Sequence, residues 1–296
     1  MRLQNLLCYG SLILCLAVFS GCSFKIYQPA WPENLPSNSS LKARSFLSLA
    51  KDKFQQAGSE KALRSSIKSF KDVLEIDPGS REALAYLCNQ YVLLGTAYTS
   101  DRKLKMHYFN EAMSYCEAAM YTNPDFRNEM ENGRKPWEAA YTLQAEDAPA
   151  MLFWVTALQY EFQETMPLPS KMVNMRWLQH GKRFLDRIQE VDPEYGNGAV
   201  ELAYTVYYCA LPKFYGGDRE KCFLYMDMAV DKSEGYLLGR WGRGRFFHQV
   251  SGDLEASRRD LEWVVLQDLS EYRDAYPWRV HFQEDAASQL LQVSVE

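Results

Sequence analysis

From Leu41 onward, hydrophobic residues recur every three to four positions, which is the period of an amphipathic α-helix. No stretch of this region alternates with the period of two that predicts a strand. Two segments, Ala148–Phe162 and Leu202–Asp218, are unusual because they are apolar and aromatic on all sides. Both are too short to cross a bilayer, which needs roughly 20 consecutive apolar residues. The pattern predicts an all-α protein organised around two buried aromatic helices.

Two sequence intervals recur within this helical region. A small residue is followed four positions later by a bulky one, and eight positions after that by proline. The three triplets are Ser66, Phe70 and Pro78; Ala112, Cys116 and Pro124; and Gly181, Leu185 and Pro193. These are the intervals of the second helix of a tetratricopeptide repeat, where the small residue lets two helices approach and proline ends the helix. Cys222 with Met226 begins a fourth copy without the proline, and a fifth follows Gly252.

The three prolines are 46 and then 69 positions apart, which exceeds the repeat length of about 34 residues. We therefore expect insertions at Asp125–Ala145 and Thr165–Lys171. The fold class predicted for residues 41–296 is an irregular tetratricopeptide-like helical-repeat solenoid. It has four to five helix pairs and a C-terminal helix around His281–Val293 that caps the last repeat.

The N-terminus resembles a bacterial lipoprotein signal. The apolar run Ser11–Val18 is followed by small residues and then by Cys22. The resemblance implies that residues 1–21 are a removed lipoprotein signal peptide, that Cys22 carries a lipid such as palmitate, and that the protein is a membrane-anchored periplasmic lipoprotein. The alternative is an ordinary secretory signal or an uncleaved anchor with an incidental cysteine.

Residues 22–40 are predicted to be a lipid-anchored tether. Three prolines and several Asn and Ser residues disfavour a helix and favour an extended segment of about 3 Å per residue. Such a segment holds the body tens of ångströms from a membrane. In the alternative arrangement Trp31 docks on the body, and the sequence leaves both open.

Charge and candidate chemistry exclude several classes of protein. The formal net charge is −5 and no block of like charge occurs, so we expect no nucleic-acid partner. The four histidines are isolated and no H-E-x-x-H, nucleotide or G-x-S-x-G motif is found, so we expect no metal, no cofactor, no catalytic residues and no enzyme activity.

Four cysteines lie in the predicted helical body, at Cys88, Cys116, Cys209 and Cys222. None is spaced as C-x-x-C, which argues against a zinc or thioredoxin-like site. Their apolar neighbours favour small buried thiols over disulfides or a nucleophile.

In a solenoid of this type the first helices of successive repeats line the concave, ligand-binding face. Two consecutive first helices are Ala150–Phe162 and Ala199–Ala210. If Ala157 and Ala203 occupy the small position, one aromatic stripe faces the groove. The predicted cleft residues are Met151, Trp154, Leu158, Phe162, Val200, Tyr204, Tyr207 and Tyr208, with Phe214 and Tyr215 at the mouth. The alternative, of equal weight, is that this stripe is core. The opposite faces (Phe153, Val155, Leu202 and Val206) are apolar too, which weakens that alternative, because both helices then need a cover on the second face: protein, a ligand or another subunit.

The next first helix, within Tyr236–Val250, carries three arginines between aromatic residues and glycines. One interpretation places Arg243 or a neighbour at the cleft mouth, where a guanidinium binds an anionic head group. The other is a solvated or salt-bridged face.

Two segments support a resemblance to a known family: Ala148-Pro149-Ala150 before the first aromatic helix, and Leu211–Asp218 (LPKFYGGD) before Lys221-Cys222. They resemble the TatT family, the periplasmic lipoprotein T components of tetratricopeptide-repeat-associated TRAP transporters. Cys222 departs from the family, in which alanine is usual. The resemblance implies a helical-repeat body, a homo-oligomer such as a trimer, a hydrophobic cleft or pore, and partnership with the solute-binding P component. Gly216-Gly217 and Asp218 also have a structural explanation, as a tight turn and a helix cap.

The sequence thus predicts a protein that binds a hydrophobic or organic-acid ligand and docks the P component to assist solute uptake. The runner-up is an envelope-assembly scaffold lipoprotein of the tetratricopeptide type, and a hydrolase of envelope polymers is a third class. A ligand-sized apolar cleft favours the first, a wide polar groove the second, and a pair of carboxylates facing a pocket the third.

Overall fold

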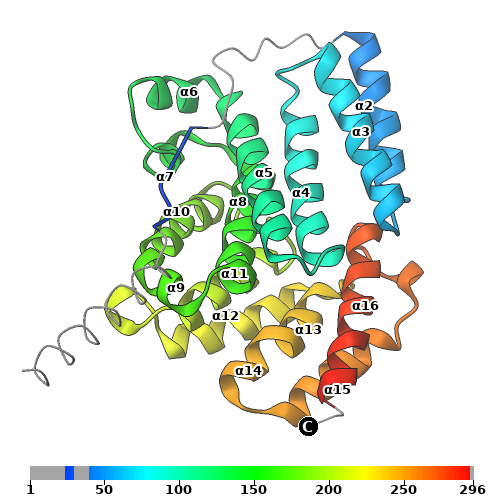
Figure 1. Cartoon of the computed structure of the whole chain (residues 1–296), viewed down its shortest axis with the longest axis vertical. Coiled ribbons are helices and arrows are strands. Elements are labelled where there is room, and N and C mark those ends of the chain that lie inside the picture. Colours follow the sequence, from blue (N-terminus) through cyan, green and yellow to red (C-terminus); the bar gives the residue numbers. More distant parts are fainter. Residues whose placement is uncertain (1–23, 30–39, 294–296) are drawn as a thin grey trace, which may run out of the picture.

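A computed structural model of the chain describes residues 24–29 and 40–293, and every regular element in them is helical (Figure 1). The α-helices are α2 (Leu41–Phe54), α3 (Glu60–Ile76), α4 (Arg81–Ala97), α5 (Arg102–Tyr121), α6 (Pro124–Glu131), α7 (Pro136–Ala139), α8 (Ala148–Tyr160), α9 (Leu168–Asn174), α10 (Arg176–Val191), α11 (Ala199–Ala210), α12 (Arg219–Lys232), α13 (Leu238–Gly242), α14 (His248–Ser251), α15 (Leu254–Val265) and α16 (Tyr276–Val293). Short 3-10 or π turns are η1 (Ala140–Thr142), η2 (Ala145–Asp147), η3 (Glu161–Thr165), η4 (Lys213–Tyr215), η5 (Arg243–Phe247) and η6 (Leu269–Glu271). The predicted all-α class is confirmed.

The helices pack as antiparallel pairs, as a tetratricopeptide-like solenoid requires. The pairs are α2 with α3, α4 with α5, α8 with α10, α11 with α12, and the interrupted helix α13–η5–α14 with α15. Gly95 illustrates how a small residue permits the approach, because a Cβ there would lie 2.5 Å from the ring of Phe109. The predicted small and bulky residues of α3, Ser66 and Phe70, are both buried. Residues 40–293 therefore contain five pairs, at the upper end of the predicted four to five.

The two predicted insertions contain short helices rather than long loops. Pro124 is the first residue of α6, where its missing N–H costs no hydrogen bond. α7 follows in the same insertion, and α9 occupies the second one, between α8 and α10. Each insertion lengthens the connection between two repeat helices, which explains the wide spacing of the prolines.

Helix α16 begins at Tyr276, five positions before the predicted start, and does more than cap the last pair. It packs along α15 and also reaches back to α4, where Trp278 Nε1 donates a 2.7 Å hydrogen bond to Asn89 Oδ1. Figure 1 shows α16 joining the lower repeats to the α2–α4 group. The C-terminal helix thus closes the open side of the solenoid.

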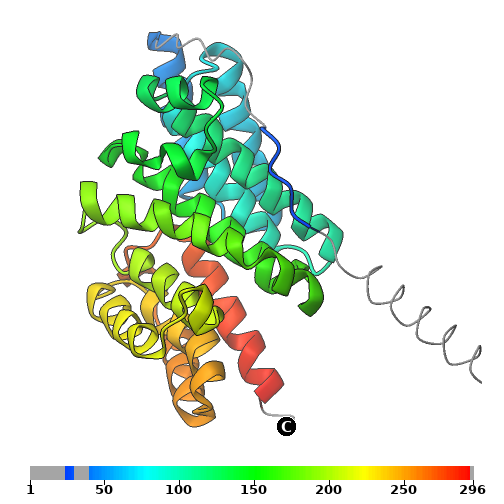
Figure 2. The ribbon, with the colours of Figure 1, turned by 90° about the vertical axis from the view of Figure 1, so that its left-hand side faces the viewer.

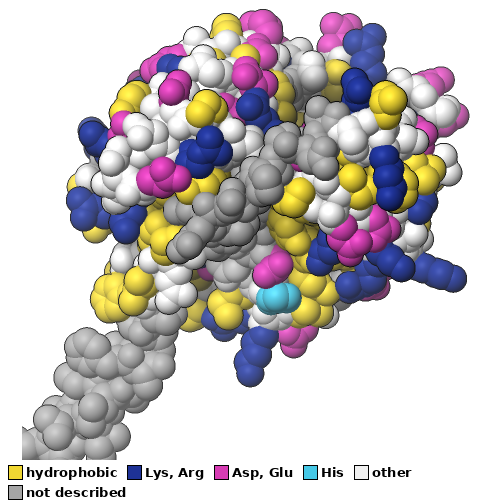
Figure 3. Space-filling view, turned by 90° about the horizontal axis from the view of Figure 1, so that it is seen from above, with side chains coloured by type: hydrophobic (Ala, Val, Ile, Leu, Met, Phe, Trp, Pro, Cys, Tyr) yellow, Lys and Arg dark blue, Asp and Glu magenta, His cyan; other side chains and the backbone are white. Residues whose placement is uncertain are grey.

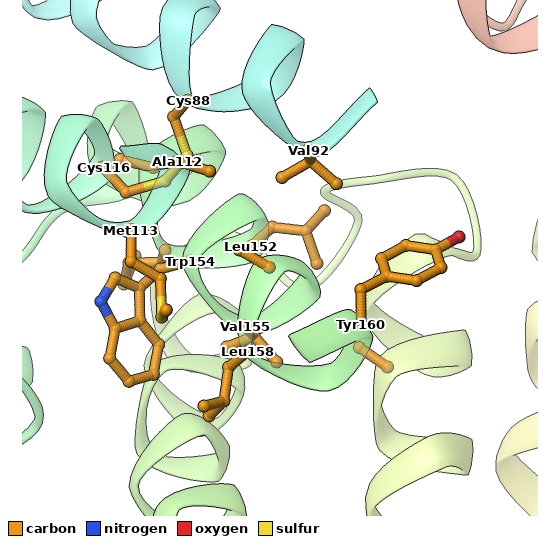
Figure 4. Packing of buried hydrophobic residues seen from close by; sticks show 14 of the residues in the cluster. Cys88, Val92, Ala112, Met113, Cys116, Leu152, Trp154, Val155, Leu158 and Tyr160 are labelled. Atoms are coloured by element: carbon orange, nitrogen blue, oxygen red, sulfur yellow. A yellow bond between two sulfur atoms is a disulfide. The ribbon is translucent and has the colours of Figure 1, made fainter. Parts of the chain in front are cut away.

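Both pairs of body cysteines form disulfides, so the prediction of free thiols was wrong. Cys88 on α4 is bonded to Cys116 on α5, and Cys209 on α11 is bonded to Cys222 on α12 (Figure 4). In each case the two Cα atoms are 5.3 Å apart. The sequence does not predict these disulfides, because the two cysteines of each pair lie on different helices and meet only when the helices pack. Neither pair has a recognisable spacing.

Residues 24–29, here called the strap, lie in an extended conformation against α5 and α10 (Figure 2). The segment predicted as a free tether is therefore docked on the body over these six residues. Trp31 and Cys22 lie outside the described residues. Within the part of the chain that is described, no helix has both the length and the hydrophobicity of a membrane span.

The face seen from above the α2 and α6 ends mixes lysines and arginines with aspartates and glutamates (Figure 3). Small hydrophobic areas lie between them. Charges of both signs are interspersed on this face, which agrees with the absence of like-charge blocks in the sequence.

Candidate ligand-binding chambers

The aromatic stripe predicted to line the cleft lies between packed helices. Met151, Trp154 and Leu158 of α8 are completely buried. The ring of Trp154 packs edge-on against Phe184 of α10 with centroids 5.0 Å apart, and it lies close to Met113 and the Cys88–Cys116 disulfide (Figure 4). Phe162 and Val200 are buried as well, and Phe162 is the one residue of the stripe that reaches a chamber described below. The stripe corresponds mainly to the core alternative.

The predicted tyrosines of α11 also pack against neighbouring helices. Tyr204 stacks on Tyr225 of α12 at 4.7 Å, and its hydroxyl donates a 2.8 Å hydrogen bond to Asp186 of α10. Tyr208 stacks on Tyr225 at 5.4 Å and meets Tyr207 edge-on at 5.1 Å. The three tyrosines therefore stabilise the junction of α10, α11 and α12.

The loop after α11 is shaped by its glycines. Phe214 is 83% exposed and Tyr215 is half-buried, and the backbone carbonyl of Tyr215 accepts a hydrogen bond from Gln179. A Cβ at Gly217 would lie 1.6 Å from the carbonyl oxygen of Leu211, and Gly216 has a φ of +97°. Asp218 accepts hydrogen bonds from two backbone amides of α12 and caps it. The LPKFYGGD segment thus has the turn-and-cap role that its residues predict.

The three arginines of the α13–η5 segment are each paired with another side chain. Arg243 forms a bidentate ion pair with Asp260, with distances of 2.6 and 2.9 Å. Arg245 lies 3.2 Å from Asp285, and the Arg240 guanidinium lies 4.3 Å from the centroid of the Trp263 ring. These contacts match the salt-bridged alternative and direct Arg243 away from the chambers.

The opposite faces of the two aromatic helices surround a cavity of about 410 Å³, here called the proximal chamber. Phe153 comes from α8, and Leu202 and Val206 come from α11. Aromatic residues of the C-terminal half complete the wall: Trp241, Phe246, Trp278 and Phe282. Helix α16 therefore forms one side of a chamber whose other side is about 120 residues earlier in the chain.

A second cavity of about 250 Å³, the distal chamber, adjoins the first. The two share wall residues Gln159, Gln163, Leu202, Val206 and Phe246. The distal chamber is otherwise lined mainly by apolar side chains, among them Phe162, Leu178, Leu211, Met226, Phe247 and Val250. Two adjoining apolar chambers of this size suit an elongated hydrophobic ligand.

Polar side chains also line the proximal chamber, and two of them, Arg273 and Asp274, are charged. The Gln159 side-chain amide donates to the Ala203 carbonyl at 2.8 Å, which leaves its own carbonyl oxygen available. Arg273 lies on the wall and forms no ion pair with any residue in the described ranges. Its neighbour Asp274 accepts a 2.7 Å hydrogen bond from the Leu237 amide, and burial raises the pKa of its carboxyl to about 6. Arg273 is thus a cation able to meet an anionic group at the chamber.

A wider groove of about 1090 Å³ lies beside the proximal chamber, between α2, α4 and α6. It shares Asn89, Phe153, Tyr195 and Ala275 with the chamber wall. Its sides carry charged residues of both signs, including Arg44, Arg81, Arg127, Glu82 and Glu146. The groove is therefore larger than either chamber and is lined by more charged side chains.

A buried carboxyl lies behind the aromatic core, in contact with the strap. Glu117 of α5 accepts hydrogen bonds from Trp154 Nε1 at 2.9 Å and from the Tyr27 hydroxyl at 3.1 Å. Burial raises the pKa of the Glu117 carboxyl to about 7, although both hydrogen bonds oppose the shift. The strap therefore rests on an acid that titrates near neutral pH.

The raised pKa of Glu117 predicts a pH-dependent stability. The unfolded chain loses this proton near pH 4.5 and the folded protein near pH 7, so the contribution of Glu117 to stability is largest at low pH and is lost as the pH rises through 7. Between pH 5.5 and 8.5 this one group should remove about 2 kcal/mol from the free energy of unfolding. Chemical denaturation of wild type and Glu117→Gln at both pH values measures it, because Gln keeps the shape of the protonated acid. Equal pH dependence of the two proteins would contradict the assignment.

In the ranges that the structure describes, no group of three or more His, Cys, Asp or Glu side chains could hold a metal ion. Asp274 is the single carboxylate among the described wall residues of the two chambers. The walls thus offer shape, apolar surface and two cations, Arg273 in the proximal chamber and Lys171 in the distal one.

The paired helices and the adjoining chambers between them define a tetratricopeptide-like helical-repeat protein. The chain belongs to the TRAP transporter T-component family, whose model matches residues 98–270. This confirms the resemblance carried by the LPKFYGGD segment and its surroundings, and it makes the chain a component associated with a transporter. Residues 37–130 also match the model of the plant-specific mitochondrial import receptor subunit TOM20. No curated protein matches the chain.

The main chamber residues that the sequence did not identify come from α13, η5 and α16. The sequence identifies Phe153, Leu202 and Val206 only as an apolar opposite face that needs a cover. That signal pointed to the correct side of the helices, because a helix that is apolar all round needs a second partner. The return of α16 to α4, which supplies that partner, has no signature in the spacing of residues.

Proposed function

We propose that the protein binds an elongated hydrophobic molecule with an acidic end, as a T component that assists uptake by a TRAP transporter. The adjoining chambers are the observation that supports this proposal. The walls of the proximal chamber come from α8, α11, η5 and α16, so this chamber depends on the return of α16 to the earlier repeats. An apolar chain buried there gains about 25 cal/mol for each Å² removed from water.

Arg273 is proposed to bind the acidic end of the ligand. It replaces Arg243 in that role, since the guanidinium of Arg243 is occupied by Asp260. A charge-assisted hydrogen bond from Arg273 would fix the orientation of the ligand, while the aromatic walls supply most of the affinity.

Mass spectrometry of the protein purified from its native envelope tests ligand binding. Under gentle conditions the protein should carry a bound molecule that organic solvent releases. A protein that carries no adduct and that also fails to bind a dansylated undecanoic acid would exclude the binding function.

The proposed partner is the periplasmic solute-binding P component of the same transporter. Membership in the T-component family supports this, and a homo-oligomer, with a trimer as one form, would multiply weak contacts into useful avidity. Affinity capture from an envelope extract should retain a solute-binding protein.

A periplasmic location and a lipid on Cys22 are proposed from two features. Two disulfides between paired helices fit an oxidising compartment, and the N-terminal sequence resembles a lipoprotein signal. Cys22→Ala should release the protein from the membrane fraction to the soluble fraction, because the lipid would be its main attachment. Immunoblots of the two fractions measure the effect, and equal membrane retention of mutant and wild type would exclude the anchor.

The runner-up, an envelope-assembly scaffold, is favoured by the wide groove beside α2 and α4, whose sides carry charged residues. The part of the chain similar to an import receptor subunit, residues 37–130, includes much of this groove. If affinity capture returned envelope-assembly proteins and no solute-binding protein, the scaffold would become the better assignment.

A further inference from the structure

The strap is attached to the end of α9 and the start of α10 through its backbone. The Lys25 amide donates a 2.7 Å hydrogen bond to Asn174 Oδ1, and the Lys25 carbonyl accepts a 3.0 Å hydrogen bond from Trp177 Nε1. Both partners are buried. These contacts fix where the chain enters the described part of the molecule.

An ion pair with little access to water strengthens this attachment. Lys25 Nζ lies 2.6 Å from Glu161 Oε2, and the two side chains are 13% and 4% exposed. Removing either partner would leave the other charge buried without compensation, which is strongly unfavourable. The strap is therefore part of the folded body at this point.

The position of Lys25 limits the distance between the body and residue 22. Two residues lie between them, so the chain makes three Cα–Cα steps and their Cα atoms are at most about 11 Å apart even when it is fully extended. A free tether over residues 22–40 would have reached several times further. A lipid on Cys22 would thus hold this side of the molecule within about 11 Å of its own attachment point.

The same side exposes large hydrophobic side chains. In the strap, Phe24 and Ile26 are 69% and 76% exposed, and in α9 Leu168 and Met172 are 70% and 58% exposed. We call these four residues the α9 patch. Arg176 is exposed beside it, and a cation there is attracted to anionic lipid head groups.

We propose that the α9 patch rests in the interface of the bilayer leaflet that carries the lipid on Cys22. The proposal rests on the proposed lipid anchor, which brings the leaflet to this side of the molecule. Apolar side chains around a basic residue are the composition of a surface that lies in a membrane interface. A second copy of the chain is the competing occupant.

This orientation has a consequence for the ligand. Lys171 of α9 and Met175 directly after it line the distal chamber. The α9 side of that chamber therefore faces the lipid surface, and a ligand with an acyl chain would exchange between the chamber and the leaflet. In this orientation the apolar part of the bilayer lies next to the α9 wall of the distal chamber.

The test attaches the mature chain to vesicles without relying on natural lipidation. Residues 22–296, with Cys22→Ser and an N-terminal histidine tag, are held on phosphatidylcholine and phosphatidylglycerol vesicles that contain a nickel-chelating lipid. An NBD dye is placed on Met172→Cys or, as the matched control, on Ser65→Cys, an exposed position of α3. Quenching by doxyl lipids should be at least about threefold stronger at position 172 than at position 65, because interfacial side chains reach the acyl boundary.

The second variant carries an insertion of about 20 Gly/Ser residues between positions 22 and 24. The insertion lets the anchor lie tens of ångströms further from the body and leaves the body unchanged. Quenching at position 172 should then fall by at least half. Equal quenching at the two dye positions would overturn the proposal, and so would an insertion that changes nothing. Self-association that shields position 172 without vesicles, and that Leu168→Asp abolishes, would assign the patch to a second copy. Finding the wild-type protein in the soluble fraction of cells would exclude the lipid anchor, but not the contact between the α9 patch and a bilayer.

Discussion

Truncation of Trp154 to alanine is expected to lower the free energy of unfolding by about 3–5 kcal/mol, the usual cost of removing a buried aromatic side chain. The indole is completely buried between α5, α8 and α10, and its Nε1 is one of the two donors to Glu117. Alanine would leave a cavity and a buried carboxyl with one hydrogen bond fewer. Thermal and urea unfolding of the purified variant measure the loss.

Phe153→Ala is the matched control because Phe153 is the neighbouring residue on the same helix and points the other way. Its ring lies on the wall of the proximal chamber and stacks on Trp278 at 6.3 Å. Phe153→Ala should lower the free energy of unfolding by less than Trp154→Ala does. It should also weaken the binding of an apolar ligand, because the ring lines the chamber. The opposite result, a stable Trp154→Ala protein that has lost ligand binding, would restore the cleft first predicted from the sequence.

The repeat fold was predictable because its determinants are local. A small residue, a bulky residue and a proline at fixed intervals specify one helix that packs on its neighbour and then ends. Ser66, Phe70 and Pro78 do this in α3 without reference to the rest of the chain. The return of α16 to α4 depends instead on a contact between Trp278 and Asn89, which are 189 positions apart, and no periodicity encodes such a contact.

The ligand-facing side of α8 could not be chosen from the sequence. Trp154 and Phe153 are equally hydrophobic, and the periodicity of an all-apolar helix gives no preferred face. The neighbouring helices decide: α5 and α10 enclose Trp154, while Phe153 faces α16, where its ring stacks on Trp278 and lines a chamber. The disulfides were missed for the same reason, since Cys88 and Cys116 meet only when α4 and α5 pack.

The sequence does not show which arginines are free to bind a ligand, because that depends on which of them form ion pairs in the fold. The Arg240–Arg245 segment has a conspicuous sequence, yet Asp260 and Asp285 lie opposite Arg243 and Arg245. Arg273 has an unremarkable sequence context and remains unpaired among the described residues because its neighbour Asp274 is bound to the start of α13. A sequence shows which charges exist, but the fold decides which of them are neutralised.

Filling the chambers should have the largest effect on binding. Val206 lines both chambers, so Val206→Trp places an indole between them. An acyl ligand excluded from about 100 Å² of apolar wall loses about 2–3 kcal/mol, which corresponds to a decrease in affinity of roughly 30- to 150-fold. Fluorescence titration with a dansylated undecanoic acid measures the change. Leu224→Trp, at an exposed position of α12, is the matched control and should bind as wild type does.

The same titration distinguishes the chambers from the groove. If the ligand occupies the chambers with its carboxylate at Arg273, Arg273→Gln should remove the preference for the acid over its uncharged amide, while Val206→Trp weakens both ligands equally. The two effects separate because Arg273 acts on the polar end and Val206 on the chain. A folded Val206→Trp protein with unchanged affinity would place the ligand in the groove between α2 and α4, where Arg44 and Arg127 would then be the cations to substitute.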